Sequence, residues 1–347
     1  MLMLMLICTG NVDALDPPPR CLPRCRPHVA QVYLNLGCML TSDDGSDRAL
    51  GRHCGAPTDV KRGVRYLEQA AELGELSAAY NLGYECENGD RDGVGKDLQK
   101  SVEWHRRAAD GGYATSQFVM CLAYSASPGN NKRFRGVLDP DSVEALRWLK
   151  LAAAQGHPRA MLWLGNALSI PGHYEGVPVR DPPHAMCGGA DPTAAVRLFR
   201  AAAERGCSAS AKSLANMYVW GCDPEKCNLL QNGFGVYAHL NHALRWYLEA
   251  VEIDDTGRSH AASGAMMALA WSLAAGYYMN SGSGNFDASV MSIKGTPDPV
   301  GAAAFMERAA EYGHPQALKY KYLSPKDKAA VMASPLPPGL YNHPLIC

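Results

Sequence analysis

Two short groups of cysteine and histidine residues are the part of the sequence best suited to chemistry, and that chemistry would be zinc binding. The first group holds Cys222, Cys227, His239 and His242, and the second holds Cys21, Cys25 and His28. Zinc needs about four thiolate or imidazole ligands that converge on one point. Both groups are loosely spaced, so we interpret them as ordinary loop residues. We predict that the chain holds no metal and no cofactor.

The motifs of common enzyme classes are absent from the sequence. It contains no phosphate-binding loop and no GxGxxG, HExxH, GxSxG or CxxC, which serve phosphate, dinucleotide, metal, serine and dithiol chemistry. Ser-x-x-Lys and Lys-Thr-Gly, which would support acyl-enzyme chemistry, do not occur either. We therefore predict that the protein is not an enzyme and takes no small-molecule substrate.

The charge balance argues against two classes of partner. The chain has 33 basic and 34 acidic side chains, which leaves a formal net charge of -1. Nucleic acids and anionic membranes attract proteins with a strong basic field, so neither is expected as an obligatory partner. The basic run Lys132 to Arg135 is an exception that we interpret as a solvated loop.

The apolar start of the chain bears on location. Its longest apolar run, Met1 to Cys8, is far shorter than the roughly 20 residues of a membrane-spanning helix. The run has the length of a signal-peptide core, but no Lys or Arg precedes it, and the sequence has no Asn-x-Ser/Thr site. We expect no membrane span and a cytoplasmic location. The secretory pathway or endoplasmic reticulum lumen stays open as an alternative, because twelve cysteines favour it.

A pattern of small and large residues recurs six times and indicates a helix in each copy. A large residue follows a small one after three positions, and an alanine follows after seven. The small residues are Gly63, Ser101, Ala145, Ala195, Ala243 and Ala302, and the large ones are Tyr66, Trp104, Trp148, Leu198, Trp246 and Phe305. Positions i, i+3 and i+7 share one helix face, so these residues are predicted to form a buried stripe.

The ends of these helices are marked as well. Aspartate stands four residues before the small residue in five copies, and His239 takes its place in the sixth. The aspartates are Asp59, Asp97, Asp141, Asp191 and Asp298, and the glycines that close the copies are Gly74, Gly112, Gly156, Gly206 and Gly313. We predict N-caps at the aspartates and left-handed turns at the glycines.

A second pattern follows each glycine and predicts a partner helix. It is a small residue, then Leu four positions on, then another small residue, as in Ala78, Leu82 and Gly83. The constant connection runs from the small residue of the first pattern to the small residue after the next Leu, as from Gly63 to Gly83, and it is 20 residues long in four successive copies. The variable connection runs from the small residue after Leu to the small residue of the next first pattern, as from Gly83 to Ser101, and its length is between 18 and 32 residues. We predict antiparallel helix pairs with tight turns on one side and variable loops on the other.

The segment from Ala79 to Gly83, continued by Gly93 to Asp97, Trp104 and the alanine pair Ala108 and Ala109, resembles a Sel-1-like repeat. The resemblance implies an all-α solenoid of about six helix-turn-helix repeats plus a terminal half repeat, related to tetratricopeptide arrays. In such arrays the first helices line a concave surface that binds protein partners. The resemblance also keeps two alternatives open, a lumenal adaptor of a membrane ubiquitin ligase and a cysteine-rich β-lactam-binding hydrolase.

We assign residues 28–323 to this solenoid, 1–27 to an N-terminal extension and 324–347 to a proline-rich tail. On first helices, positions outside the predicted stripe are candidates for binding a partner polypeptide, together with the inserted loops. These candidates are Tyr80, Tyr84, Glu87, Asn166, Lys212, Asn216 and Trp271. Exposed aromatic and amide groups suit peptide recognition. Packing of the aromatics against inserted loops is the alternative interpretation.

Overall fold

A computed structural model describes eleven stretches of the chain. They are 26–41, 46–47, 52–53, 59–89, 95–125, 134, 136–169, 191–220, 240–254, 260–274 and 298–333. The first helices of the pairs are α2 (Arg26–Thr41), α4 (Leu76–Asn88), α6 (Ala114–Tyr124), α8 (Pro158–Leu168), α11 (Ser208–Trp220), α13 (His260–Ala274) and α15 (Pro315–Lys321). The second helices are α3 (Val60–Glu72), α5 (Leu98–Asp110), α7 (Ser142–Ala154), α10 (Pro192–Ala203), α12 (Leu240–Ile253), α14 (Pro299–Glu311) and α16 (Pro325–Ala333). The predicted all-α fold is confirmed, with one addition, a two-residue antiparallel pairing of β1 (Ser46–Asp47) with β2 (Arg52–His53).

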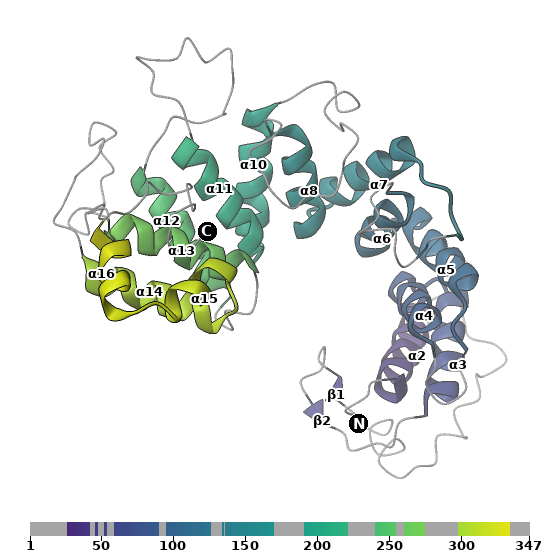
Figure 1. Cartoon of the computed structure of the whole chain (residues 1–347). Helices are drawn as coiled ribbons and strands as arrows, with labels where there is room; N and C mark the ends of the chain where they lie inside the picture. The colour runs from purple at the N-terminus through teal and green to yellow at the C-terminus, as the bar shows by residue number, and fades with distance from the viewer. Residues whose placement is uncertain are drawn as a thin grey trace. The chain divides into compact units, whose positions relative to one another are not determined.

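The chain forms two compact units, Met1–Ala152 and Ala153–Cys347. In the first unit α2 packs on α3, α3 on α4, α4 on α5 and α5 on α6 (Figure 1). In the second unit α8 packs on α10, and the series continues through α11, α12, α13, α14 and α15. Within each of these two series a helix packs on its neighbour along the chain, which is the arrangement of a helical repeat array.

The five predicted aspartate caps are confirmed. Each carboxylate accepts a hydrogen bond from an amide of the first helical turn, for example from Ala194 to Asp191 at 2.9 Å and from Gly301 to Asp298 at 2.8 Å. The other three caps are Asp59, Asp97 and Asp141. This bond lowers the pKa of the Asp97 carboxyl, chiefly because the Lys100 amide stabilises the charged form.

The glycines after the second helices are left-handed, as predicted. Their φ angles run from 80° at Gly313 to 98° at Gly112. The residue after the glycine then donates its amide to a carbonyl five residues back, as from Tyr113 to Ala108 at 2.9 Å. This geometry turns the chain directly into the next first helix.

The variable loops are closed at their base by a recurring backbone bond. The amide of each capping aspartate donates to a carbonyl in the last turn of the preceding first helix, from Asp191 to Leu168 at 2.9 Å and from Asp298 to Leu273 at 3.0 Å. The same bond joins Asp59 to Leu40, Asp97 to Cys86 and Asp141 to Tyr124. Because both ends of the connection are fixed, loops of different length fit without disturbing the helix pair.

The alanines of the predicted buried stripe are buried, but its large position is displaced by one residue. The most deeply buried large side chains of the second helices follow the predicted ones, and Tyr66, Trp104, Leu198, Trp246 and Phe305 are only half-buried. The buried residues are Leu67, His105, Leu149, Phe199, Tyr247 and Met306. On a helix, position i+4 lies about 40° to one side of position i, whereas i+3 lies about 60° to the other side. Position i+7 lies between them, so a large residue at either i+3 or i+4 shares a face with the small residues. Trp148 is buried as predicted, together with its neighbour Leu149.

The small residue after Leu on the first helix receives this buried side chain. A methyl group added at Gly37, Gly83 or Gly165 would lie 2.6 Å from an atom of Leu67, His105 or Phe199 respectively. Such a distance is far inside van der Waals contact. These glycines are therefore sockets for the large residue of the partner helix.

The last helix lies within residues 324–347, which the sequence assigned to a tail. Ser324 accepts the Asp327 amide at 3.2 Å and donates to its carboxylate at 2.6 Å, so the two residues cap the start of α16. Residues 334–347 lie outside the described part of the chain, as does most of the extension 1–27.

Candidate protein-binding surface

The α4 surface carries two tyrosines on one face, as predicted. Tyr84 is 46% exposed, and Tyr80 lies one turn earlier and is half-buried. Asn88, one turn later, is exposed and donates from its side chain to the Tyr84 carbonyl at 3.0 Å. We call Tyr80, Tyr84 and Asn88 the α4 face. Asn88 was not among the sequence candidates, although its i+8 spacing from Tyr80 places it on the same side.

Glu87 requires a correction. It was expected on the exposed side of α4, but it is only 6% exposed. It lies one turn after Gly83, which meets His105, and so on the side of α4 that packs against α5. Its place in a binding surface stays a prediction, but one that its burial does not favour.

The Tyr80 ring is braced, that is, held in place by packing against other rings. Its ring centroid lies 5.5 Å from that of His105 and 5.6 Å from that of Tyr113, with tilted planes. Phe134, from the connection between α6 and α7, packs edge-on against His105 at 6.5 Å. Phe134 is only 1% exposed, which corrects the interpretation of Lys132 to Arg135 as wholly solvated. The aromatic cluster therefore holds Tyr80 in a fixed position while Tyr84 faces solvent.

The candidates of the second unit lie on three different helices. Asn166 of α8, Lys212 of α11 and Asn216 of α11 are all half-buried. The amide oxygen of Asn216 accepts the hydroxyl of Tyr247 at 2.5 Å, and the buried amide oxygen of Asn166 has no hydrogen-bond partner among the described residues. Trp271 belongs to α13, but its side chain lies outside the described part of the structure. The Asn216 oxygen is thus used within the fold, and the Asn166 oxygen is buried rather than presented to a partner.

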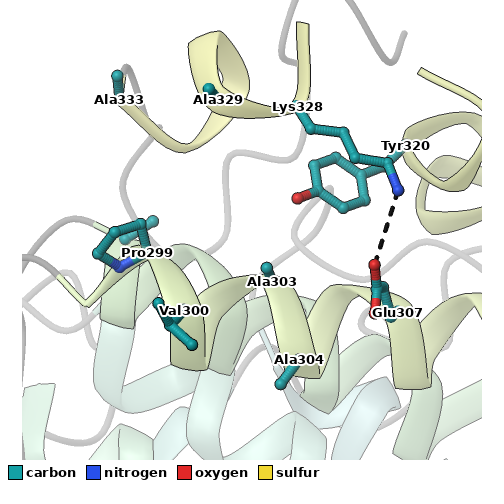
Figure 2. Close-up of a pocket in the computed structure, with 10 residues that line it drawn as sticks. Pro299, Val300, Ala303, Ala304, Glu307, Tyr320, Lys328, Ala329 and Ala333 are labelled. Carbon is teal, nitrogen blue, oxygen red and sulfur yellow. Dashed lines mark ion pairs between the residues drawn. The ribbon is translucent and has the colours of Figure 1, made fainter. Parts of the chain in front are cut away.

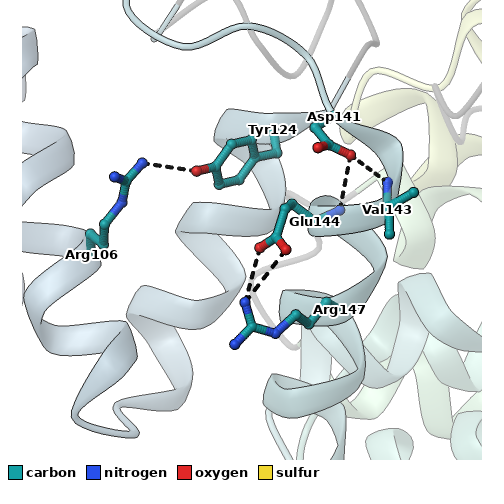
Figure 3. A network of polar contacts seen from close by, with 6 residues as sticks. All are labelled: Arg106, Tyr124, Asp141, Val143, Glu144 and Arg147. Carbon is teal, nitrogen blue, oxygen red and sulfur yellow. Dashed lines mark hydrogen bonds and ion pairs between the residues drawn. The ribbon is translucent and has the colours of Figure 1, made fainter.

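An arginine–tyrosine pair recurs between second and first helices and was missed by the sequence reasoning. Arg106 of α5 donates to the Tyr124 hydroxyl at 2.8 Å, next to the capping residues of α7 (Figure 3). The equivalent pair, also 18 residues apart, joins Arg200 to Tyr218 at 3.1 Å. The recurrence of Arg and Tyr at this spacing was the available signal. Each pair fixes a tyrosine at the end of a first helix.

The zinc hypothesis finds no support in the described residues. No group of three metal-ligating side chains occurs there, and the His242 ring stacks on Tyr218 with centroids 5.2 Å apart. The other members of that group, Cys222, Cys227 and His239, lie outside the described residues, as do Cys21 and Cys25.

Within the described ranges, no helix is both long and apolar enough to cross a membrane.

Among the described cysteines, Cys86, Cys121 and Cys207 are free thiols. Burial raises the pKa of Cys121 to about 12. The thiolate is the reactive form, so Cys121 should be nearly inert in the folded protein. We expect iodoacetamide at pH 8 to leave Cys121 unmodified until urea unfolds the chain, as measured by peptide mass spectrometry. Labelling of Cys121 in native protein as fast as in urea would contradict its burial.

The comparison with known families identifies the array. The model of the Sel1 repeat matches residues 48–75, 76–113, 131–157, 187–207, 217–255 and 288–314, just over half of the chain. The chain belongs to the Sel1 repeat family. Sel1 repeat proteins are generally scaffolds for protein interaction.

Two solved structures share the Sel1 repeat fold with this chain. A protective antigen from uropathogenic Escherichia coli strains, described as displaying an SLR fold, is 21% identical with a TM-score of 0.57. The match covers 89% of this chain but 53% of the antigen, so this chain spans about half its length. A Sel1 repeat protein from Oxalobacter formigenes is 20% identical with a TM-score of 0.52, over 74% of this chain and 81% of that one. At these identities the likeness concerns the fold alone. No curated protein matches the chain.

Proposed function

We propose that this Sel1 repeat chain is a non-catalytic scaffold that binds partner polypeptides through its first helices. The observation that carries the proposal is the α4 face, where an exposed Tyr84 stands beside a Tyr80 braced by His105 and Tyr113. Tyrosine anchors contribute much of the energy of many interfaces. A rigid anchor also loses little side-chain entropy on binding.

The partner expected for the α4 face is a polypeptide with an apolar side chain and free backbone groups. The Tyr84 ring offers an apolar surface, and its hydroxyl and the Asn88 amide offer hydrogen bonds. The inserted loops, whose bases are fixed by the capping aspartates, would add contacts around such a site.

The test begins with a photocrosslinking amino acid placed at position 84 in the full chain, which would covalently capture the bound protein. Tyr322 is the matched control, because it is a tyrosine that is 81% exposed and lies just beyond the end of α15. We then expect Tyr84→Ala to weaken the captured partner's binding about tenfold or more, as for a tyrosine hot spot. Tyr322→Ala should leave binding unchanged.

The proposal fails if position 84 captures no more protein than position 322, or if Tyr84→Ala binds the captured partner as tightly as the unmodified chain. Equal helical circular dichroism of both variants shows that the helices are intact. Recovery of membrane ubiquitin-ligase components would instead assign the chain to that class of adaptor.

A further inference from the structure

An open groove lies at the last helices of the second unit. The groove has a volume of about 730 Å³ and runs between α14 and α16, with Tyr320 of α15 at one end. Figure 2 shows Pro299, Val300, Ala303 and Ala304 along α14, with Ala329 and Ala333 of α16 across the groove. At the Tyr320 end, Lys328 pairs with Glu307 at 3.6 Å and lies 5.2 Å from the centre of the Tyr320 ring. The groove is therefore apolar along its length, and its two charges neutralise each other.

The α14 wall of this groove differs from the other second helices. Ala304 stands six residues after the capping Asp298, a position that is charged in every other copy: Arg65, Glu103, Arg147, Arg197 and Arg245. Val300, two residues after the same cap, is 79% exposed. An apolar wall thus replaces the solvated face that the other copies present.

We propose that residues 334–347 of the same chain bind in this groove. Ala333 lines the groove and is followed directly by Ser334, so the segment starts at the site itself. Residues 334–347 contain four prolines and the apolar residues Leu336, Leu340, Tyr341, Leu345 and Ile346, with no Asp, Glu, Lys or Arg. An uncharged apolar segment matches a groove whose own charges are already paired. The proposal does not depend on the proposed scaffold function.

The direction and length of the segment fit the groove. In Figure 2, Ala333 lies at the Pro299 end of α14 and Lys328 at the Glu307 end. Pro335 disfavours a helical Ser334, so α16 is not expected to continue beyond Ala333. About seven residues in a polyproline conformation span about 22 Å, which is the length of a 13-residue helix such as α14, about 20 Å. The segment is therefore long enough to return along α14 to Glu307.

The test uses the full chain with a photocrosslinking amino acid at position 300. Position 143 is the matched control, because Val143 also stands two residues after a capping aspartate and is 63% exposed. We expect crosslinks from position 300, and not from position 143, to peptides of 334–347. A mixture of unlabelled and nitrogen-15-labelled protein distinguishes bonds within one chain from bonds between copies.

A second variant, Ala304→Arg, places in the groove wall the residue that four other second helices carry at this position. It should keep the melting temperature and reduce the 300-to-tail crosslink to the level seen from position 143. Crosslinks from position 300 only to other residues, only to a second copy, or to 334–347 with undiminished yield in Ala304→Arg would each overturn the proposal.

Discussion

Replacement of Phe199 by alanine is expected to lower the free energy of unfolding by about 3–5 kcal/mol. Phe199 is fully buried and packs with Ala195, Val196, Leu214 and Met217. Its ring also fills the socket at Gly165. The loss therefore combines the transfer of an aromatic ring to water with a cavity between two helices. Urea unfolding of the full chain, followed by circular dichroism at 222 nm, measures the change.

Leu198→Ala is the matched control for this prediction. The spacing in the sequence pointed to Leu198 as the core residue of α10, but Leu198 is only half-buried. We expect it to cost about 1–2 kcal/mol, because much of its side chain is already in contact with water. If Leu198→Ala lowers the free energy of unfolding more than Phe199→Ala does, Leu198 is the core residue, as the sequence spacing indicated.

The parts of the fold that the sequence predicted correctly are those set by local chemistry. An aspartate caps a helix through its own first turn, and a glycine adopts positive φ because it has no Cβ. Asp191 and Gly206 could therefore be placed without knowing their neighbours, and both behave as predicted. The pairing of helices followed from the constant turn between them.

The displaced stripe shows what local spacing leaves undecided. Leu198 and Phe199 are both apolar, and either would suit a helix with small residues at i and i+7. The socket at Gly165 on another helix decides in favour of Phe199. At His105 the same position is polar, so composition gave no hint that it is buried.

The candidate surface was predicted only in part for the same reason. Tyr84 is exposed as its position suggested, but the bracing of Tyr80 by Tyr113 and His105 involves residues on other segments. Phe134 reaches the cluster from a connection whose course the sequence does not specify. The burial of Glu87 depends on how closely α5 approaches α4, which periodicity within α4 cannot give.

The socket itself is tested by Gly165→Ala, for which two effects have opposite signs. In an exposed helix this change stabilises by about 1 kcal/mol, because alanine has the higher helix propensity. In α8 the added methyl would lie 2.6 Å from Phe199 Cε1, and overpacking of this kind costs about 1–3 kcal/mol. We expect overpacking to prevail, with a net loss of up to about 2 kcal/mol in urea unfolding.

Gly264→Ala in α13 is the control, because the atoms nearest to its added methyl belong to the flexible end of the Lys212 side chain. Lys212 can move aside, so this variant should gain up to about 1 kcal/mol from helix propensity. The decisive measurement is Gly165→Ala in a Phe199→Ala background, where the clash is gone and the sign should reverse to a gain. A double-mutant cycle gives the coupling between the two positions. If Gly165→Ala destabilises the chain equally with and without the Phe199 ring, the two helices do not meet at this socket.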